Sequence, residues 1–297
     1  MVWRREIIQT LLEANIKGNI IKFIYNFLKQ RYIKVRVNDT LSNKIELQNG
    51  IPQGSIFSVT LFPIAINKLT RIISPPAKIS LFVDDATIFI SGKNLETLRK
   101  TAQDILNKVC EFSDNSGFKF YKTKSTFIIF SKKRFQNEIS SYLRNEIIPQ
   151  CKELKILGIT LDQKMSWKPH IQNLKIECSK RLNLVKILAG KTWGADMQIL
   201  KQTYSAFVRA KLDYGSIIYN KAKSRIKKIL DPINNTGTRV ICGAFKTSPI
   251  ESVCESNLPT LAQRRRNLTL NYITKVMSNT KNPVYQIFEN SVHYLKL

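Results

Sequence analysis

The chain has 297 residues, 43% of them hydrophobic, and 48 Lys and Arg against 21 Asp and Glu give a formal net charge of +27. This size and apolar content suffice for a core in two or more folding units. The positive excess indicates a polyanionic partner, first of all nucleic acid, with an anionic membrane surface as the less specific alternative. No apolar run approaches the roughly 18 residues of a membrane span, and no secretory signal peptide is recognisable.

Cysteine and histidine usage excludes the commonest structural sites. The cysteines form no CxxC pair, and an odd number at irregular spacing is typical of reduced thiols inside a cell. They are Cys110, Cys151, Cys178, Cys242 and Cys254. The two histidines have no metal-ligand spacing, so we expect no zinc site. We therefore expect an intracellular protein.

The first 76 residues predict helix, hairpin and helix in that order. Apolar residues recur at steps of three and four over 2–30, with a break at "KGN". The alternation in "RYIKVRVNDTLSNKIELQNG" predicts a β-hairpin that turns through "NDTLSN", residues 38–43. After the loop "GIPQGSIFS", a helix is expected over 59–73, which the "SPP" at 74–76 ends.

The stretch "SLFVDDATIFIS", residues 80–91, places two adjacent acids in an apolar, β-prone run. It predicts the strands "KISLFV" and "ATIFI" around a turn at Asp84 and Asp85. A helix is then expected over 94–116, with Asn94 as its N-cap and Gly117 as its end.

The rest of the chain changes from extended to helical. "FKFYKTKSTFIIF" predicts an extended pair, 135–150 a polar connector, and "ELKILGITLD" a strand pair around Gly158. Beyond Trp167 the pattern is almost wholly helical to about residue 275. Residues 164–228 contain 15 basic side chains against Glu177, Asp196 and Asp213. Their spacing indicates basic helical faces, although a solvated surface is the simpler reading for any single helix.

Consecutive strand residues point to opposite faces, so Asp84 and Asp85 serve one site only if the backbone turns between them. Close carboxylates repel unless a cation lies between them. Mg²⁺ is the natural cation, because it prefers oxygen ligands and is held by one or two carboxylates plus substrate phosphates. In a basic protein this indicates two-metal phosphoryl or nucleotidyl transfer; an ordinary Asp-Asp turn is the alternative if the pair is considered alone.

The order of motifs resembles the reverse transcriptases of non-LTR retrotransposons of the jockey type. The resemblance covers nearly the whole chain and rests on "GIPQGSIFSVTLF", "LFVDDATIF", "GFKFYKTKS", "ELKILGITLD" and the segment "LAGKTWGADMQILKQTYSAFVRAKLDYGSIIY". It implies an α+β fold in which a partial polymerase palm and fingers, an antiparallel sheet with helices, precedes an all-helical thumb and linker. The implied domains are palm and fingers over 1–150, primer-grip hairpin and thumb over 151–230, and a following helical region over 231–297.

The resemblance also implies roles for single residues. Asp84 is similar to the palm carboxylate that binds catalytic Mg²⁺, with Mn²⁺ as a substitute, and Asp85 to its metal-binding neighbour. Val83 would lie beside the incoming nucleotide, and Lys124 near the leaving pyrophosphate, unless it is simply a solvated lysine of a basic loop. The remaining implied residues hold template and nucleotide near bare backbone: Pro52, Gln53 and Gly54. The implied partners are an RNA template, a DNA primer and dNTPs; no membrane is implied, and protein partners are open. Residence in the nucleus, the cytoplasm or both is implied only by this family resemblance.

Two departures from the family pattern affect the expected activity. Phe57, Val59 and Thr60 replace the leucine, proline and leucine that usually follow the Gln-Gly pair. Relatives also carry a third metal-binding aspartate upstream of the segment "VWRREIIQTLL". We therefore expect an N-terminally truncated polymerase that is inactive alone, and the alternative is a non-catalytic basic remnant that binds nucleic acid.

Overall fold

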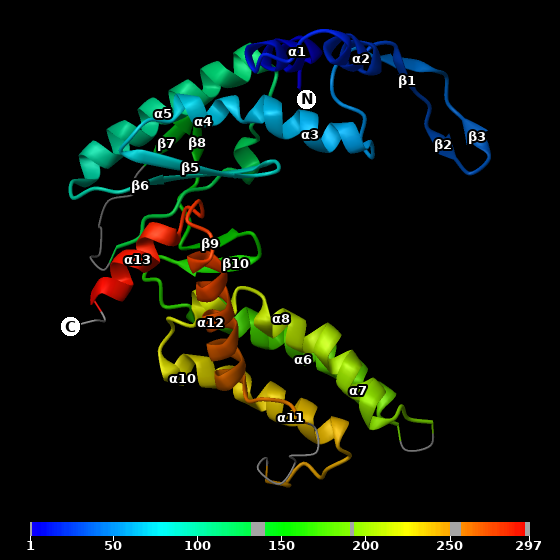
Figure 1. Cartoon of the computed structure of the whole chain (residues 1–297), viewed down its shortest axis with the longest axis vertical. Coiled ribbons are helices and arrows are strands. Elements are labelled where there is room, and N and C mark those ends of the chain that lie inside the picture. The colour runs from blue at the N-terminus through cyan, green and yellow to red at the C-terminus, as the bar shows by residue number, and fades with distance from the viewer. Residues whose placement is uncertain (1, 132–139, 191–192, 250–256, 295–297) are drawn as a thin grey trace. The chain divides into compact units, whose positions relative to one another are not determined.

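The computed structural model describes residues 2–131, 140–190, 193–249 and 257–294 (Figure 1). The chain divides into two compact units. Unit 1 comprises residues 1–127 and 135–151, and unit 2 comprises 128–134 and 152–297. Each unit has a hydrophobic core of its own, so the two are described separately.

Unit 1 begins with the two predicted helices, α1 (Arg4–Glu13) and α2 (Asn19–Leu28). The break between them falls at Gly18, whose φ of 73° lies in the left-handed region that glycine adopts without strain. Ile7, Leu11 and Ile24 of the predicted apolar stripe are buried, whereas Leu12 and Ile20 of that stripe are exposed. Leu28, at the end of α2, is also buried.

The hairpin after α2 has a tighter turn than predicted. Strand β1 (Arg31–Ile33) pairs with β4 (Ile45–Leu47), and β2 (Arg36–Val37) pairs with β3 (Thr40–Leu41). The turn is therefore Asn38–Asp39 and not residues 38–43, because Thr40 and Leu41 pair with Val37 and Arg36. Asn38 has a φ of 52°, which asparagine tolerates in tight turns.

The predicted helix over 59–73 forms as two helices, α3 (Ile56–Ile66) and α4 (Lys68–Ile72). Helix α3 begins three residues earlier than the sequence indicates and accommodates Pro63 in its interior. Strands β5 (Ala77–Phe82) and β6 (Asp85–Ile90) follow as an antiparallel hairpin. Helix α5 (Leu95–Ser116) confirms both predicted ends: the Asn94 side chain accepts from two backbone N–H groups, and Gly117 ends the helix in the left-handed conformation.

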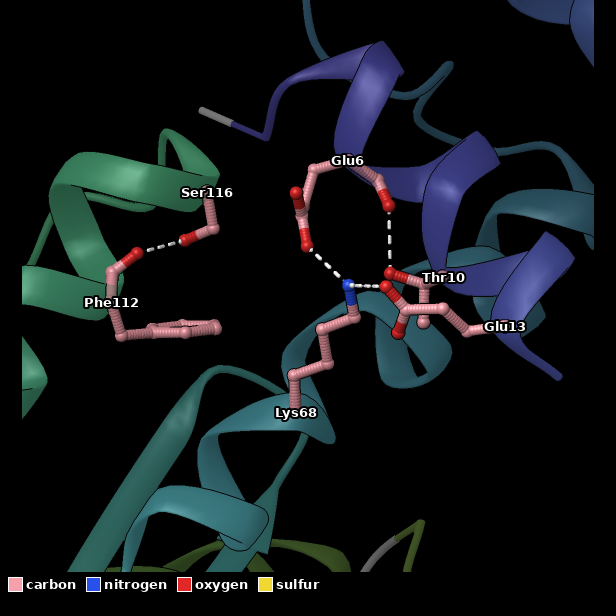
Figure 2. Close-up of polar contacts among 6 residues, drawn as sticks. All are labelled: Glu6, Thr10, Glu13, Lys68, Phe112 and Ser116. Carbon is pink, nitrogen blue, oxygen red and sulfur yellow. Dashed lines mark hydrogen bonds and ion pairs between the residues drawn. The ribbon is translucent and has the colours of Figure 1, made fainter.

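The core of unit 1 holds the β5–β6 hairpin in place. Its buried side chains come from α1, α2, α3, α4 and α5, and Ile79, Leu81, Ile88 and Ile90 of the hairpin pack against them. Figure 1 shows the hairpin beside these helices. A partly buried polar contact ties α4 to α1: Lys68 Nζ lies 2.6 Å from Glu6 Oε1 and 3.1 Å from Glu13 Oε1 (Figure 2).

The prediction for residues 118–150 is largely wrong. No strand pair forms over the described part of 118–130, which contains the 3₁₀ turn η1 (Lys122–Lys124) and a single bridge from Phe127 to Gln150. The predicted connector contains a hairpin, β7 (Ser141–Leu143) with β8 (Glu146–Ile148). Residues 135–139 of that connector lie outside the described residues.

Unit 2 begins with the predicted hairpin around Gly158, formed by β9 (Glu153–Ile156) and β10 (Ile159–Asp162). Helix then dominates, as predicted, and continues beyond residue 275. The elements are α6 (Lys168–Leu188), α7 (Met197–Tyr204), the π-helical turn η2 (Ser205–Arg209), α8 (Ala210–Asp213), α9 (Ser216–Tyr219), α10 (Ser224–Lys227), η3 (Lys228–Leu230), α11 (Asp231–Ile241), α12 (Leu261–Met277) and α13 (Tyr285–Tyr294).

The core of unit 2 runs along α6, whose buried residues Ile171, Leu174, Cys178, Leu182 and Val185 recur at helical spacing. It extends without interruption through α7, α11 and the start of α12. Burial raises the pKa of the Cys178 thiol to about 11, so this cysteine is an inert core residue.

The described residues thus combine helices with five separate two-stranded antiparallel sheets. This confirms a mixed α and antiparallel-β class for unit 1 and a helical unit 2, but the described strands form no single larger sheet. No helix in the described ranges has the length and apolar character needed to cross a membrane.

Candidate active site

The two adjacent acids lie at the tip of the β5–β6 hairpin, but one position further along than predicted. Phe82 pairs with Asp85, so the two turn residues are Val83 and Asp84, and Asp85 is the first residue of β6. The predicted turn at Asp84 and Asp85 is therefore wrong by one residue. The register explains this, because it places Leu81 opposite Ala86 and Ile79 opposite Ile88.

The hairpin separates an apolar face from an outer polar face. Paired residues of an antiparallel ladder share a face, and faces alternate along each strand. The pairs Ile79–Ile88 and Ala77–Ile90 lie on the core side, so Phe82 and Asp85 lie on the opposite side. Asp84 and Asp85 are both exposed, and Phe82 beside them is 58% exposed. One face of the hairpin thus packs against the core, while both carboxylates at its tip remain in solvent.

Val83 is held in an unfavourable backbone conformation at this tip. Its φ is 53°, in the left-handed region, where a β-branched residue is a genuine outlier. Its side chain is 60% exposed, so burial of the valine does not offset this strain. Strained turns of this kind are concentrated at ligand-binding and catalytic sites.

The acid pair carries the oxygen donors that a divalent metal ion prefers. Among the described residues, neither Asp84 nor Asp85 has a hydrogen-bond or ion-pair partner, so their oxygens are available to a cation. Two carboxylates suit Mg²⁺ when substrate phosphates and water complete the octahedron. Nowhere in the described ranges do three or more His, Cys, Asp or Glu residues group as metal ligands. The residues present therefore fit part of a two-metal site.

Three of the four predicted nucleotide and template residues, Pro52, Gln53 and Gly54, lie in one loop between β4 and α3, and the fourth, Val83, lies in the β5–β6 turn. Gln53 and Gly54 are exposed, and Pro52 is half-buried, with its carbonyl accepting a hydrogen bond from the Ser58 hydroxyl. Gly54 has a φ of 85°, and no atom lies within 4 Å of the place where a Cβ would stand. The backbone at Gly54 is therefore not covered by other atoms of the described chain.

Lys124 lies in a different segment, the η1 turn, with an exposed side chain. In the described part of the chain no hydrogen bond or ion pair joins Lys124, or the loop 52–54, to Asp84 or Asp85. Val83, Asp84 and Asp85 thus lie together at the tip of one hairpin. The loop 52–54 and Lys124 belong to other segments of unit 1.

An aromatic cluster beside the loop 52–54 was missed from the sequence. The Phe57 ring lies 5.3 Å from that of Phe23 and 5.8 Å from that of Phe27, between centroids. Ile56, next in the chain, is 88% exposed. Phe23 and Phe27 are four residues apart and so share a helix face, which is a signal that could have indicated the cluster.

Comparison with known proteins identifies the class. Residues 1–161, more than half of the chain, match the family model described as reverse transcriptase (RNA-dependent DNA polymerase). The chain therefore belongs to the reverse transcriptase family.

The relatives specify the branch of that family. The RNA-directed DNA polymerase from mobile element jockey of Drosophila melanogaster is 23% identical over 263 residues, which cover 85% of this chain and 28% of that protein. The probable RNA-directed DNA polymerase from transposon X-element of the same species is 20% identical, with 80% of this chain and 26% of that protein covered. The corresponding protein of transposon BS is 23% identical, with 73% and 25% covered. The predicted resemblance to jockey-type retrotransposon polymerases is confirmed, and the chain spans about a quarter of these relatives.

Proposed function

We propose that this chain forms the catalytic hairpin and the thumb of an RNA-directed DNA polymerase from a non-LTR retrotransposon. The observation that carries the proposal is the β5–β6 tip, where Asp84 and Asp85 are exposed and without protein partners while the strands behind them are packed into a core. A fold gains nothing by placing two repelling charges together on a strained turn. A metal-bound nucleotide would compensate both charges.

In this proposal Asp84 and Asp85 hold Mg²⁺, or Mn²⁺ in its place. When bound, the metal would neutralise phosphate charge and stabilise the attacking and leaving oxygens of nucleotidyl transfer. Val83 would contact the incoming nucleotide beside the acids. Lys124 would place its charge near the leaving pyrophosphate.

The loop 52–54 would position the substrates. Gly54 would let template and nucleotide approach the backbone, since it lacks a Cβ and faces open space. Gln53 would supply amide hydrogen bonds there. Pro52 would restrict the loop, which the bond from Ser58 to its carbonyl already ties to the first turn of α3.

The proposed domains are a partial palm and fingers over 1–150, a primer-grip hairpin and thumb over 151–230, and a linker region over 231–297. The division of the chain into two units after residue 151 supports the first boundary. The substrates would be an RNA template, a DNA primer and dNTPs. Basic residues of α6 to α10 would contact the phosphates, and six such contacts would give a slope of about −5 in log K against log salt.

We also propose that this chain alone extends no primer, because a two-metal site requires a further carboxylate. Within the described residues no third ligand joins Asp84 and Asp85. Two further aspartates of unit 1 are already paired with arginines. Asp114 in α5 pairs with Arg144, and Asp39 in the β2–β3 turn pairs with Arg36 at 3.3 Å.

Primer extension tests both parts of this proposal. The chain alone, and a fusion that adds an upstream palm segment with the third aspartate, are supplied with a primed RNA template, dNTPs and Mg²⁺ or Mn²⁺. We expect extension only by the fusion, with loss of at least 100-fold in Asp84→Asn and no change in Asp39→Asn, a matched exposed turn carboxylate. Extension by the chain alone that vanishes in Asp84→Ala would refute its inactivity. Extension by the fusion that survives Asp84→Ala would refute the site.

The net charge of +27 favours a second candidate, a non-catalytic protein that binds nucleic acid through its basic helices. This candidate predicts salt-sensitive binding of RNA or DNA together with an inactive fusion. The two functions therefore differ in the extension assay and agree in the binding assay.

A further inference from the structure

The ends of three helices in unit 2 surround a cavity of about 310 Å³. They are the C-terminal end of α6, the start of α7 and the C-terminal end of α11. Trp193, Met197 and Ile241 line it, together with glycines 190, 194 and 243. The three glycines keep side chains out of this space, and that volume accommodates one nucleobase.

Trp193 presents a free aromatic face at this cavity. Its ring atoms Cε2 and Nε1 lie 3.3 Å from the place where a Cβ on Gly190 would stand, so the indole rests on the glycine backbone. Ala195 N, two residues after Trp193, donates a hydrogen bond of 2.8 Å to Leu188 O near the end of α6. The side chain is nevertheless 65% exposed, and a tryptophan that only filled the core would be covered.

A second aromatic ring and a local positive charge accompany this face. Phe245, two residues after the lining residue Gly243, is 84% exposed. The described charged side chains on the segments that form the cavity are mostly basic: Lys186, Lys201, Arg239 and Lys246 against Asp196. The Asp196 carboxylate is engaged, since it accepts from Ile199 N at 2.7 Å to cap α7.

We propose that this cavity, with Trp193 as its stacking platform, binds an unpaired base of single-stranded nucleic acid. An exposed indole above a base-sized space, with basic residues on the segments that form the cavity, is the combination that single-strand binding uses: stacking on the base and attraction of the backbone. RNA and single-stranded DNA share this chemistry. The site goes beyond the proposed polymerase function, because it would hold an unpaired base, whereas the basic residues of the proposed thumb would contact the phosphates of the paired primer–template.

Binding of fluorescein-labelled U12, dT12 and a 12-base-pair duplex to the full chain tests this site, without dNTPs or divalent metal. Stacking of one base on an aromatic ring is worth roughly 5- to 150-fold in affinity. Trp193→Leu, which keeps apolar cover over Gly190 but has no aromatic ring, is expected to weaken single-strand binding by about tenfold and duplex binding by less than twofold. Trp193→Phe should stay within about threefold of the natural chain.

The matched control is Phe207→Ala, which removes a half-exposed aromatic ring of the same unit that does not line the cavity. It should leave all three affinities unchanged. A loss in Trp193→Leu for both U12 and dT12, or for one of them, supports the site and names RNA, DNA or both as its ligand. Equal weakening of duplex and single strands, or no weakening, overturns it. Neither outcome depends on Asp84 or Asp85, so failure here leaves the polymerase proposal standing.

Discussion

The β5–β6 hairpin of unit 1 and the β9–β10 hairpin of unit 2 have the same plan but differ in the second residue of the turn and in what supports the turn. Each joins two antiparallel strands through two residues, Val83–Asp84 in the first and Leu157–Gly158 in the second. Leu157 and Gly158 both have positive φ, 46° and 81°, as the favoured hairpin turn requires. The Leu157 carbonyl also accepts a hydrogen bond of 2.6 Å from the Tyr214 hydroxyl. The unit 2 turn is therefore supported by glycine and by a neighbouring side chain.

The acids at the two hairpins also differ in whether the protein supplies them with hydrogen-bond partners. Asp162, at the end of β10, accepts from the backbone N–H groups of Ser166 at 3.1 Å and Trp167 at 2.9 Å. Burial alone would raise the pKa of this carboxyl, but these hydrogen bonds outweigh burial and lower it. Among the described residues Asp84 and Asp85 have no such partners. Asp162 therefore stabilises the fold, whereas the side chains of Asp84 and Asp85 make no stabilising contact with the described residues.

The largest effect is expected from Asp162→Ala. Two backbone donors at the start of α6 would lose their acceptor, which costs about 2 kcal/mol in the free energy of unfolding. Urea denaturation at pH 7 measures it. Asp85→Ala is the matched control, expected within about 0.5 kcal/mol. Equal losses of unfolding free energy in Asp162→Ala and Asp85→Ala would contradict the proposed difference between the two acids.

Exchanging the turn residues should change stability in opposite directions. Gly158→Val forces a β-branched residue into a positive φ and should lower the free energy of unfolding by about 1–2 kcal/mol. Val83→Gly relieves the same strain and should raise it by about 0.5–1 kcal/mol. Thermal denaturation of both variants checks the signs. A destabilised Val83→Gly would mean that the turn is not strained.

A smaller, pH-dependent effect is expected behind the β9–β10 hairpin. Thr160 N donates to His170 Nδ1 at 3.3 Å, and the imidazole lies 5.4 Å from the Tyr219 ring. Burial lowers the pKa of His170, with Lys211 and Lys155 acting in the same direction and Glu177 opposing them.

The unfolded chain therefore binds a proton near pH 6.5, whereas the folded chain does so only at lower pH. Stability should fall as pH drops from about 6.5 towards the folded pKa. Urea denaturation at pH 7.5 and 5.5 should show a smaller drop in His170→Leu than in the natural chain. An equal drop in both would assign the dependence to other groups.

The smallest effect on stability is expected from the two acids on which the proposed function depends. Asp84→Asn and Asp85→Asn should each change the free energy of unfolding by less than about 0.5 kcal/mol, because both side chains are exposed and lack protein partners. A slight gain is consistent with the removal of like-charge repulsion. A loss above 1 kcal/mol in either variant would give that acid a structural role.

Sequence reasoning succeeded where local chemistry decides the structure. The helices α1, α2 and α5 follow from apolar spacing, Gly18 and the Asn94 cap, and the β9–β10 hairpin follows from Gly158. It failed where packing decides. The turn at 83–84 depends on which pairs of the ladder face the core, a register that the adjacent acids do not specify. The β7–β8 hairpin has strands of only three residues and a turn at Arg144 and Asn145, both with positive φ. Strands this short give too little apolar–polar alternation to distinguish them from a polar connector.

For the candidate site, the sequence located the acid pair and the glycine loop but not their surroundings. The adjacency of Asp84 and Asp85 is visible in any reading, and so is the flexibility of Gly54. Exposure of both carboxylates, the strain at Val83 and the Phe23–Phe57 contact arise only from tertiary packing. Trp193 carries no motif of its own, and its free face follows from the glycine beneath it.

Mn²⁺ binding followed by electron paramagnetic resonance tests most directly whether the β5–β6 tip is a metal site. The account predicts that the natural chain binds Mn²⁺ at this tip and that Asp84→Asn and Asp85→Asn each weaken binding at least fivefold with unchanged stability. Asp39→Asn, the exposed carboxylate of the β2–β3 turn, should bind as the natural chain does. Equal Mn²⁺ binding by the natural chain and Asp84→Asn would contradict the account.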